Sequence, residues 1–420
     1  MKLFQQMLAA GATLSLLAPV AAQASDVVNL EEMNSYSRSK TKSSRLDSKT
    51  FINEVSEDIA NLKGRLDGLE VKQNEFEAGG FSDTTTLDGK AVFGLMATDH
   101  SKVKTDGTDS LSAAYQYTMN LNTSFTGDDN LYVRLRTGNS AGNFVDKEFG
   151  TYLSMGTGYA DALKVDKIWY TFPVGESNTV WVGPKIENYY MHGTTPSIYK
   201  PVTKQFKLGG NGAAYGASTD SGVGWAYKGD NGFSLSSNVV SKQNKSTKGF
   251  LSDQAKTNWS TQVAYTTDTY HVSLIGAMKY NGWTDSYYTT SLGKARPDGN
   301  STNYGLRGYW RPDSETQAVP EISAGYDIST VEGQDADTDA YFVGLTWKDT
   351  FQADDKIGIA LGQPQTADTD TVTPFTWEAY YSYKVNDSVT VSPAIFGATD
   401  RTGTSGVDIT GAVVQTTFKF

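Results

Sequence analysis

The chain ends in Gly411-Ala412-Val413-Val414-Gln415-Thr416-Thr417-Phe418-Lys419-Phe420, a stretch whose side chains alternate in character. In a β-strand, successive side chains point to opposite faces, so one face carries Ala412, Val414, Thr416, Phe418 and Phe420 and the other carries Val413, Gln415, Thr417 and Lys419. An edge strand of a soluble sheet is one interpretation. Because the pattern runs to the terminal Phe, it is typical of the last strand of an outer-membrane barrel, which pairs with the first strand to close the sheet. We expect Phe418 and Phe420 to be the signal that the barrel-assembly machinery reads.

The other end of the sequence predicts export. Lys2 gives a short positive start, residues 7–22 are almost entirely apolar or small, and Ala22-Gln23-Ala24 fits a small-x-small cleavage pattern. A membrane helix is the alternative, but the apolar stretch is too short for one. We therefore expect a signal peptide over residues 1–24. No later stretch approaches ~18 apolar residues, so insertion into a membrane would have to use a barrel.

Composition narrows the class of protein. The 420 residues include 41 Gly and 24 Tyr but no Cys, so disulfides and thiolate chemistry are excluded. The hydrophobic fraction of 38% is compatible with a barrel, because a barrel strand presents only every second side chain to lipid. The formal charge of −11 argues against partners such as nucleic acid or an anionic membrane surface.

The region before the predicted barrel has two parts. Residues 25–50 are polar and predict a flexible lead-in. Residues 51–78 repeat apolar positions at alternating spacings of three and four, which is typical of a coiled-coil stem. The core positions are Ile52, Val55, Ile59, Leu62, Leu66, Leu69, Gln73 and Phe76. A stem of about four heptads that contains Gly64 and Gly68 is marginal alone, so we expect it to associate with copies of itself; packing on its own barrel is the alternative.

From residue 81 to residue 420 the period of the sequence is two. Tyr270, Val272, Leu274, Gly276, Met278 and Tyr280 share one face of a strand, with an aromatic residue at each end. Similar rows recur, and short turns separate them at Thr266-Thr267-Asp268, Asp230-Asn231-Gly232 and Asn386-Asp387. A soluble sandwich also alternates, but aromatic residues at both strand ends favour lipid-facing rows. At roughly 20 residues per strand and connection, this part makes about 14 to 18 antiparallel strands, and we expect about 16 around a water-filled lumen.

Catalytic chemistry finds little support in the sequence. The three histidines, His100, His192 and His271, fall in separate segments and predict no common site. An outer-membrane phospholipase would need a nucleophile and a base near one rim, so this enzyme class is a weak alternative. We expect no catalytic residue, no metal site and no cofactor.

One connection is long and basic. The chain leaves a strand at Gly183-Pro184 and runs to residue 210 with little alternation. This segment carries Lys185, Lys200, Lys204 and Lys207 against Glu187 alone. If it folds into the lumen, it forms a positive constriction that favours anions, to which Arg134 and Arg136 add their charge from the wall. The alternative is a solvated loop on the outside.

Two stretches and the stem resemble a known family. Trp377-Glu378-Ala379-Tyr380-Tyr381-Ser382-Tyr383-Lys384-Val385-Asn386-Asp387, followed by Val389-Thr390-Val391-Ser392-Pro393, resembles the penultimate hairpin of carbohydrate-selective, OprB-like porins. The ending Gln415-Thr416-Thr417-Phe418-Lys419-Phe420 and the heptad stem resemble the Som-type branch of that family in cyanobacteria, in which some members are labelled iron-uptake porins. The resemblance covers nearly all of the mature chain.

The resemblance implies a trimeric outer-membrane channel that passes small solutes and inorganic ions, with its constriction loop at residues 183–210. The chain departs from many such porins at residues 25–50, which are too short for the surface-layer-homology domain that grips cell-wall polysaccharide. An anchor that tethers the membrane to the cell wall through the stem is therefore the alternative function. Sugar selectivity is not carried over.

We therefore predict an all-β transmembrane barrel that acts as a passive diffusion porin of the cell outer membrane. The partners we expect are outer-membrane lipid, two further copies of the chain in a homotrimer, and the small solutes and ions that pass. A receptor with a plug is excluded, because residues 25–80 are too few for a plug domain.

Overall fold

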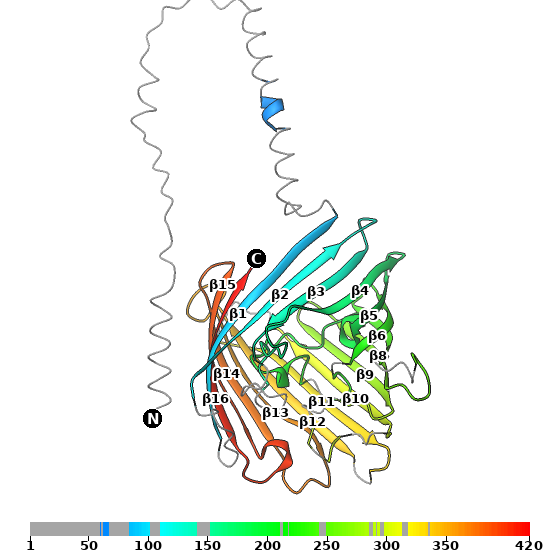
Figure 1. The fold of residues 1–420 in the computed structure, drawn as a ribbon, viewed down its shortest axis with the longest axis vertical. Coiled ribbons are helices and arrows are strands. Elements are labelled where there is room, and N and C mark those ends of the chain that lie inside the picture. Colours follow the sequence, from blue (N-terminus) through cyan, green and yellow to red (C-terminus); the bar gives the residue numbers. More distant parts are fainter. Residues whose placement is uncertain are drawn as a thin grey trace, which may run out of the picture. The chain divides into compact units, whose positions relative to one another are not determined.

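The computed structural model describes residues 59, 62–66, 84–100, 110–140, 152–210, 213–216, 218–242, 249–284, 289–290, 292–294, 298–312, 318–334 and 337–420. Within these residues the chain forms a closed antiparallel barrel in which each strand pairs with its neighbours in sequence (Figure 1). β1 also pairs with β16, so the sheet has no free edge.

The barrel has 16 strands among the described residues, which confirms the expected number. They are β1 (Thr85–His100), β2 (Ser112–Thr123), β3 (Asn130–Gly138), β4 (Lys164–Val174), β5 (Asn178–Glu187), β6 (Thr219–Lys228), β7 (Phe233–Ser241), β8 (Thr257–Thr266), β9 (Tyr270–Tyr280), β10 (Ser301–Trp310), β11 (Glu321–Val331), β12 (Thr338–Lys348), β13 (Lys356–Ala367), β14 (Phe375–Lys384), β15 (Val389–Thr399) and β16 (Ile409–Lys419). Three short 3-10 helices are η1 (Asn188–Met191), η2 (Lys204–Phe206) and η4 (Arg401–Gly403).

The carboxyl-terminal strand closes the barrel as its alternation predicts. Phe418 lies opposite Ala91 of β1, and its ring lies 5.3 Å from that of Phe93. The terminal Phe420 accepts a 2.9 Å hydrogen bond from the backbone N–H of Gly89 and stacks on Tyr117 of β2. A Cβ on Gly89 would lie 2.7 Å from the Phe420 ring, so glycine is needed for this close approach.

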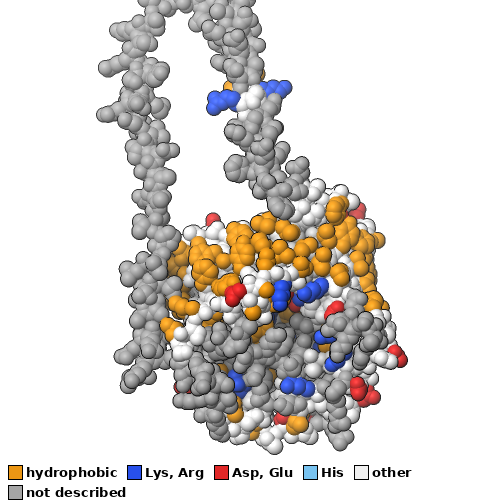
Figure 2. Space-filling view, in the orientation of Figure 1, with side chains coloured by type: hydrophobic (Ala, Val, Ile, Leu, Met, Phe, Trp, Pro, Cys, Tyr) orange, Lys and Arg blue, Asp and Glu red, His pale blue; other side chains and the backbone are white. Residues whose placement is uncertain are grey.

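The outer surface of the strands is apolar, and the predicted rows face outward. In β9 the exposed side chains are Tyr270, Val272, Leu274, Met278 and Tyr280, and the buried ones are His271, Ser273, Ile275, Ala277 and Lys279. Neighbouring strands expose Trp259, Val263, Tyr265, Tyr304, Leu306 and Trp310. Figure 2 shows such hydrophobic side chains gathered over the strands. The rows are therefore placed to contact lipid rather than one another, which excludes a sandwich core.

Two turns at the end of the barrel that carries Phe420 are built alike. Their sequences are Ser124-Phe125-Thr126-Gly127-Asp128-Asp129 and Thr350-Phe351-Gln352-Ala353-Asp354-Asp355. In each, the last Asp accepts hydrogen bonds from backbone N–H groups of the turn. Each carboxylate also accepts a tyrosine hydroxyl from a neighbouring strand, Tyr170 to Asp129 at 2.5 Å and Tyr381 to Asp355 at 2.9 Å. The phenylalanine of each turn is left exposed at the rim.

The chain divides into two units, Met1–Thr86 and Leu87–Phe420, and the first is described here by itself. Its described residues 59 and 62–66 are helical, and the predicted core side chains Ile59, Leu62 and Leu66 are 59%, 63% and 57% exposed. The predicted signal peptide over 1–24, the lead-in over 25–50 and the core positions Ile52, Val55, Leu69, Gln73 and Phe76 lie outside the described residues. No helix in the described ranges is long and apolar enough to cross a bilayer.

The predicted bounds of the basic loop are wrong at both ends. β5 continues past Gly183-Pro184 to Glu187, and β6 begins only at Thr219, so the connection spans residues 188–218. A bulge between Gly183 and Ile186 explains the difference, because it takes Pro184 out of the regular ladder of hydrogen bonds. Lys185 and Glu187 therefore belong to the barrel wall.

Candidate functional site

The β5–β6 loop (residues 188–218, described for 188–210, 213–216 and 218) lies inside the barrel in its described part and crosses it (Figure 1). Its contacts pass from wall to wall: His192 bonds to Ser236 of β7, Thr194 donates to Gln262 of β8, and Tyr199 donates to Glu378 of β14. Of the two interpretations of this segment, a solvated loop on the outside is thus wrong. No pattern within the segment itself indicates which way it folds, because its partners lie up to 179 residues away in the chain.

Residues 208–210 of this loop lie close against the barrel wall. Leu208, Gly209 and Gly210 all have positive φ, and a Cβ on Gly210 would lie 2.8 Å from Phe342. The chain here passes over Arg307 of β10, which is fully buried and forms a 2.6 Å ion pair with Asp327. Only residues without a Cβ fit such a close backbone approach.

The β3–β4 loop (residues 139–163, described for 139–140 and 152–163) joins the β5–β6 loop inside the barrel. Leu153 and Thr203 form an antiparallel bridge. The backbone N–H of Ser154 donates to the Val202 carbonyl at 2.7 Å, and the N–H of Lys204 donates to the Tyr152 carbonyl at 2.7 Å. The two loops are therefore connected by backbone as well as by side chains.

One sector of the interior is filled by apolar side chains from the wall and from both loops. They are Val92, Met96, Ala114, Leu153, Met155, Tyr199, Val202, Phe206, Phe342, Ala360, Tyr380, Ala394, Phe396 and Val413. This sector of the interior is therefore packed with side chains rather than open to water. Large apolar residues at lumen parity, such as Phe342 and Phe396, were the signal that the loops would dock there.

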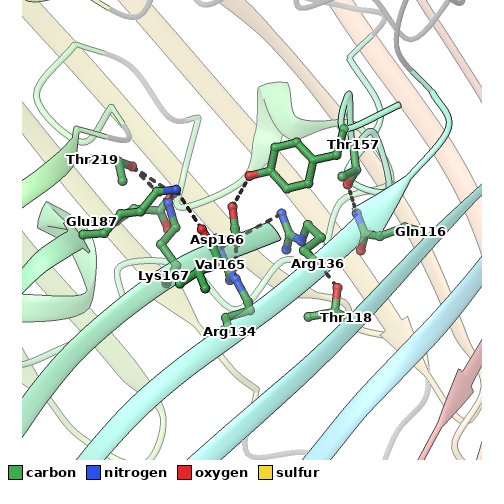
Figure 3. Close-up of polar contacts among 12 residues, drawn as sticks. Gln116, Thr118, Arg134, Arg136, Thr157, Val165, Asp166, Lys167, Glu187 and Thr219 are labelled. Carbon is green, nitrogen blue, oxygen red and sulfur yellow. Dashed lines mark hydrogen bonds and ion pairs between the residues drawn. The ribbon is translucent and has the colours of Figure 1, made fainter. Parts of the chain in front are cut away.

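A β-bulge shapes the wall formed by β3 and β4. The pairing of β3 with β4 shifts between Arg134 and Leu135, so the adjacent residues Asp166 and Lys167 are both buried on the inside. Asp166 accepts a 2.5 Å hydrogen bond from Nε of Arg134 and a 2.5 Å bond from the Tyr159 hydroxyl. Figure 3 shows Arg134 and Arg136 extending toward this carboxylate. The bulge thereby places an acid and a base side by side in the wall.

A second ion pair lies next to the first. Lys167 contacts Glu187 at 3.0 Å, and the same carboxylate accepts the Thr219 hydroxyl (Figure 3). It also accepts the Tyr189 hydroxyl. Arg136 lies 3.7 Å from Asp166, so its contact with the acid is looser than that of Arg134. Much of the charge of Arg134 and Lys167 is therefore balanced locally, and that of Arg136 less so.

Lys204 lies in η2 and Lys207 directly follows it, and both face this wall. Nζ of Lys204 donates to the Tyr152 hydroxyl at 2.6 Å and lies 4.0 Å from the centre of that ring, and Lys207 lies 5.7 Å from the Tyr189 ring. Burial, together with the nearby charges of Lys207 and Arg136, holds the pKa of Lys204 well below its usual range. Burial also lowers the pKa of Lys207 and raises the pKa of Tyr152 to about 12.

The predicted constriction residues separate into two groups. Arg134, Arg136, Glu187, Lys204 and Lys207 come together as expected. Lys185 instead donates to the carbonyl of Val165 at 2.9 Å, and Lys200 is exposed. The sequence analysis missed Asp166 and Lys167, which the bulge turns toward the interior. It also missed Lys90 of β1, which interacts electrostatically with Arg136 and Lys207.

The cluster carries an excess of positive charge. Its cations are Lys90, Arg134, Arg136, Lys167, Lys204 and Lys207, and its carboxylates are Asp166 and Glu187. Six cations against two carboxylates leave a formal excess of four positive charges in this set, in a chain whose net charge is −11. We call this set of eight residues the basic cluster.

The histidines with described side chains lie apart, as their sequence positions predict. His192 bonds to Ser236 in the β5–β6 loop interface, whereas His271 of β9 bonds to Thr266 and stacks on Tyr309. Burial lowers the pKa of His192 to about 3, so this ring is neutral at pH 7. The arrangement suits packing of the loop rather than proton transfer.

Comparison with known proteins identifies the family. Residues 44–420 match the carbohydrate-selective porin, OprB family. The chain belongs to this family. It is accordingly an outer-membrane porin, a channel for small solutes and not an enzyme. The narrower assignment to the Som-type branch stays a prediction.

Other proteins are similar to this chain in sequence or in fold. An uncharacterized protein of Nostoc sp. is 26% identical over 87% of this chain and 71% of its own length. Among solved structures, Pseudomonas putida OprB has a TM-score of 0.59 with 12% identity, covering 82% of this chain and 97% of that one. An anion-selective porin from Comamonas acidovorans has a TM-score of 0.53 with 12% identity, covering 80% and 99%. At such identities the structural likeness concerns the fold alone.

Proposed function

We propose that this porin prefers small anions, and that Lys204, Lys207 and Arg136 determine the preference. The observation that carries the proposal is the formal excess of four positive charges in the basic cluster, on two facing parts of the interior. Charged side chains that line a pore raise the local concentration of ions of opposite sign. Because Asp166 and Glu187 balance Arg134 and Lys167, the remaining cations contribute most of the field.

The test is a pair of double variants in a planar bilayer. In a KCl gradient, the wild-type reversal potential should indicate a Cl⁻/K⁺ permeability ratio above 1, and Lys204→Gln/Lys207→Gln should lower that ratio by about twofold or more. Lys185→Gln/Lys200→Gln removes the same charge from the predicted loop segment, at a wall residue and at an exposed residue, and should change the ratio less than the first pair does. Equal effects of the two pairs would show that position in the cluster does not matter.

Sugar passage is a second candidate, suggested by the description of the family. It is favoured by a row of closely packed aromatic rings beside the basic cluster. Trp169 lies 4.3 Å from Tyr132 and 4.8 Å from Tyr190, and Tyr190 lies 4.7 Å from Tyr189. Aromatic faces of this kind suit the apolar faces of sugar rings. Liposome swelling in neutral sugars separates the two candidates, because an anion channel of small cutoff would admit chloride but little hexose.

We also propose that residues 1–24 are removed on export and that the stem over residues 51–78 joins three chains. The exposed Ile59, Leu62 and Leu66 support the stem proposal, because a narrow apolar stripe needs a partner to be buried. Cross-linking of the full chain should trap trimers, and Leu62→Lys should reduce them. A wall anchor without transport is less favoured. Absence of any conductance from the purified protein would support it instead.

A further inference from the structure

We propose that Glu378 is a positioning residue that holds the β5–β6 loop against the wall and thereby sets where the Lys204 ammonium group stands in the passage. The proposal rests on the proposed function in one respect, namely that Lys204 helps to select the ion. It assigns a role to a residue of the opposite wall that the chemistry of the basic cluster does not use.

Glu378 lies on β14 and faces the interior, where its side chain is 0% exposed. Its carboxylate accepts four hydrogen bonds, and all of them come from the β5–β6 loop. The donors are the Tyr199 hydroxyl at 2.9 Å, the Val202 N–H at 3.1 Å, the Thr203 N–H at 2.8 Å and the Thr203 hydroxyl at 2.6 Å. One side chain of the wall thus binds three residues of the loop.

The charge of Glu378 has no basic partner within the described part of the chain. No Lys or Arg there forms an ion pair with it, whereas the interior carboxylates Asp166, Glu187 and Asp327 each have one. A buried carboxylate is costly unless it is hydrogen-bonded, and hydrogen bonds to an ionised acceptor are among the stronger ones. The loop donors are therefore what makes this buried charge tolerable, and the same bonds hold the loop.

Thr203 connects Glu378 to Lys204, the next residue in the chain. The backbone of Thr203 is extended, with φ −90° and ψ 146°, so neighbouring side chains leave the chain in different directions. Thr203 points its hydroxyl at Glu378, and Lys204 reaches Tyr152. Thr203 is also the residue that bridges to Leu153 of the β3–β4 loop. Glu378 is therefore connected through one residue to both loops and to the lysine–tyrosine contact.

Apart from Glu378, the barrel wall contacts this part of the loop through the Ser323 hydroxyl, which accepts the N–H groups of Ile198 and Tyr199 at 3.2 and 3.3 Å, and through aromatic rings. Tyr199 lies 5.7 Å from the Phe342 ring and 5.9 Å from the Tyr380 ring, and Phe206 also packs on Phe342. These apolar contacts are non-directional and permit sliding of the loop. The hydrogen bonds to Glu378 fix the position of the loop beside Lys204, because they are made by Val202 and Thr203. Loss of them should leave the loop inside the barrel but allow the Lys204 segment to move.

The first experiment reads the position of the loop without using selectivity. The chain has no Cys, so Lys204→Cys can be labelled with a nitroxide in the full-length porin. In the parent protein we expect an immobile spectrum. Glu378→Gln, which places an amide NH₂ among donors, and Thr203→Val, which removes only the hydroxyl, should each produce a mobile component. Thr203→Ser, which keeps the hydroxyl, should not.

Glu321→Gln is the matched control, because Glu321 is also a buried carboxylate but bonds to Arg311 and Lys348 instead of the loop. Heat-dependent gel mobility checks that each variant is folded, and Thr203→Val keeps the test decisive if Glu378→Gln fails to assemble. An immobile label in both Glu378→Gln and Thr203→Val, or equal mobility in Glu321→Gln, would overturn the proposal.

A second measurement connects the position to function. Glu378→Gln with native Lys204 should shift the Cl⁻/K⁺ permeability ratio in the same direction as Lys204→Gln, with little further change when the two are combined. A wild-type ratio of 1 would defeat the proposed anion preference yet leave the label result intact. A mobile loop with an unchanged ratio would overturn the claim that Glu378 sets the place of the lysine charge.

Discussion

Lys204 and Lys207 have lowered pKa values because they are buried and because other cations lie near them. For a lysine, a lowered pKa means that the positive charge is lost at a lower pH than usual. As pH rises from neutral, these two side chains should therefore lose charge before reaching the ordinary value of 10.5. Their contribution to anion preference is complete at the lower pH and decreases as pH rises through the lowered pKa values.

We predict that the Cl⁻/K⁺ permeability ratio falls as pH is raised from neutral toward 10.5. Reversal potentials measured over this range check the prediction, and Lys204→Gln/Lys207→Gln is the control because it should show a much flatter profile. A wild-type ratio that stays constant up to 10.5 would mean that both lysines titrate normally or lie outside the conducting path.

At the scale of elements, the paired turns show how local sequence fixes the rim. The Tyr170 hydroxyl and the N–H groups of the turn lower the pKa of Asp129. A carboxylate whose pKa is lowered by folding contributes stability at neutral pH and loses that contribution as pH falls below its ordinary value of 3.8. The turn should therefore open in acid before the strands separate.

We predict that Asp129→Asn speeds hydrogen exchange at the amides of Phe125 and Thr126, since the neutral amide is a weaker acceptor than the carboxylate it replaces. Asp128→Asn changes the adjacent charge without removing these bonds and is the matched control. Exchange that is equally slow in both variants would mean that the aspartate does not hold the turn. Mass spectrometry of peptides covering residues 124–129 gives the measurement.

Much of the strand pattern could be predicted, because alternation is a local property. The row from Tyr270 to Tyr280 faces lipid as expected, and the turn at Thr266-Thr267-Asp268 falls between two strands. Two β-bulges explain why some residues of the site were predicted incorrectly. One bulge keeps Lys185 in the wall and another brings Asp166 and Lys167 to the same side, and each changes the alternation of inward and outward side chains along its strand.

The positions of the loops inside the barrel could not be predicted either, and the reason is different. Glu378 meets Thr203 across 175 residues, and no local periodicity reports on such a pair. Arg134 and Arg136 were found because they alternate with lipid-facing residues on one strand. Lys204 and Tyr152 lie in two different loops and meet only because both loops fold into the barrel.

At the scale of the whole molecule, closure of the barrel depends on the last residue. The backbone of Phe420 exchanges hydrogen bonds with Gly89, and its ring stacks on Tyr117 at 5.8 Å. We predict that Phe420→Ala lowers the temperature at which the heat-modifiable gel band unfolds, because the stacked pair contributes about 0.5–1.5 kcal/mol beyond its buried area. Leu292→Ala, at an exposed residue between β9 and β10, is a control. An unchanged transition in Phe420→Ala would show that the terminal ring does not stabilise the assembled barrel.

The central claim is that the barrel encloses an open aqueous path whose narrow part is positively charged on two sides. The most direct test is the reversal potential of the purified wild-type porin in a planar bilayer under a KCl gradient. We predict stepwise conductance and a reversal potential whose sign shows that chloride is more permeant than potassium. A bilayer that never conducts, or a potential on the potassium side, would contradict it.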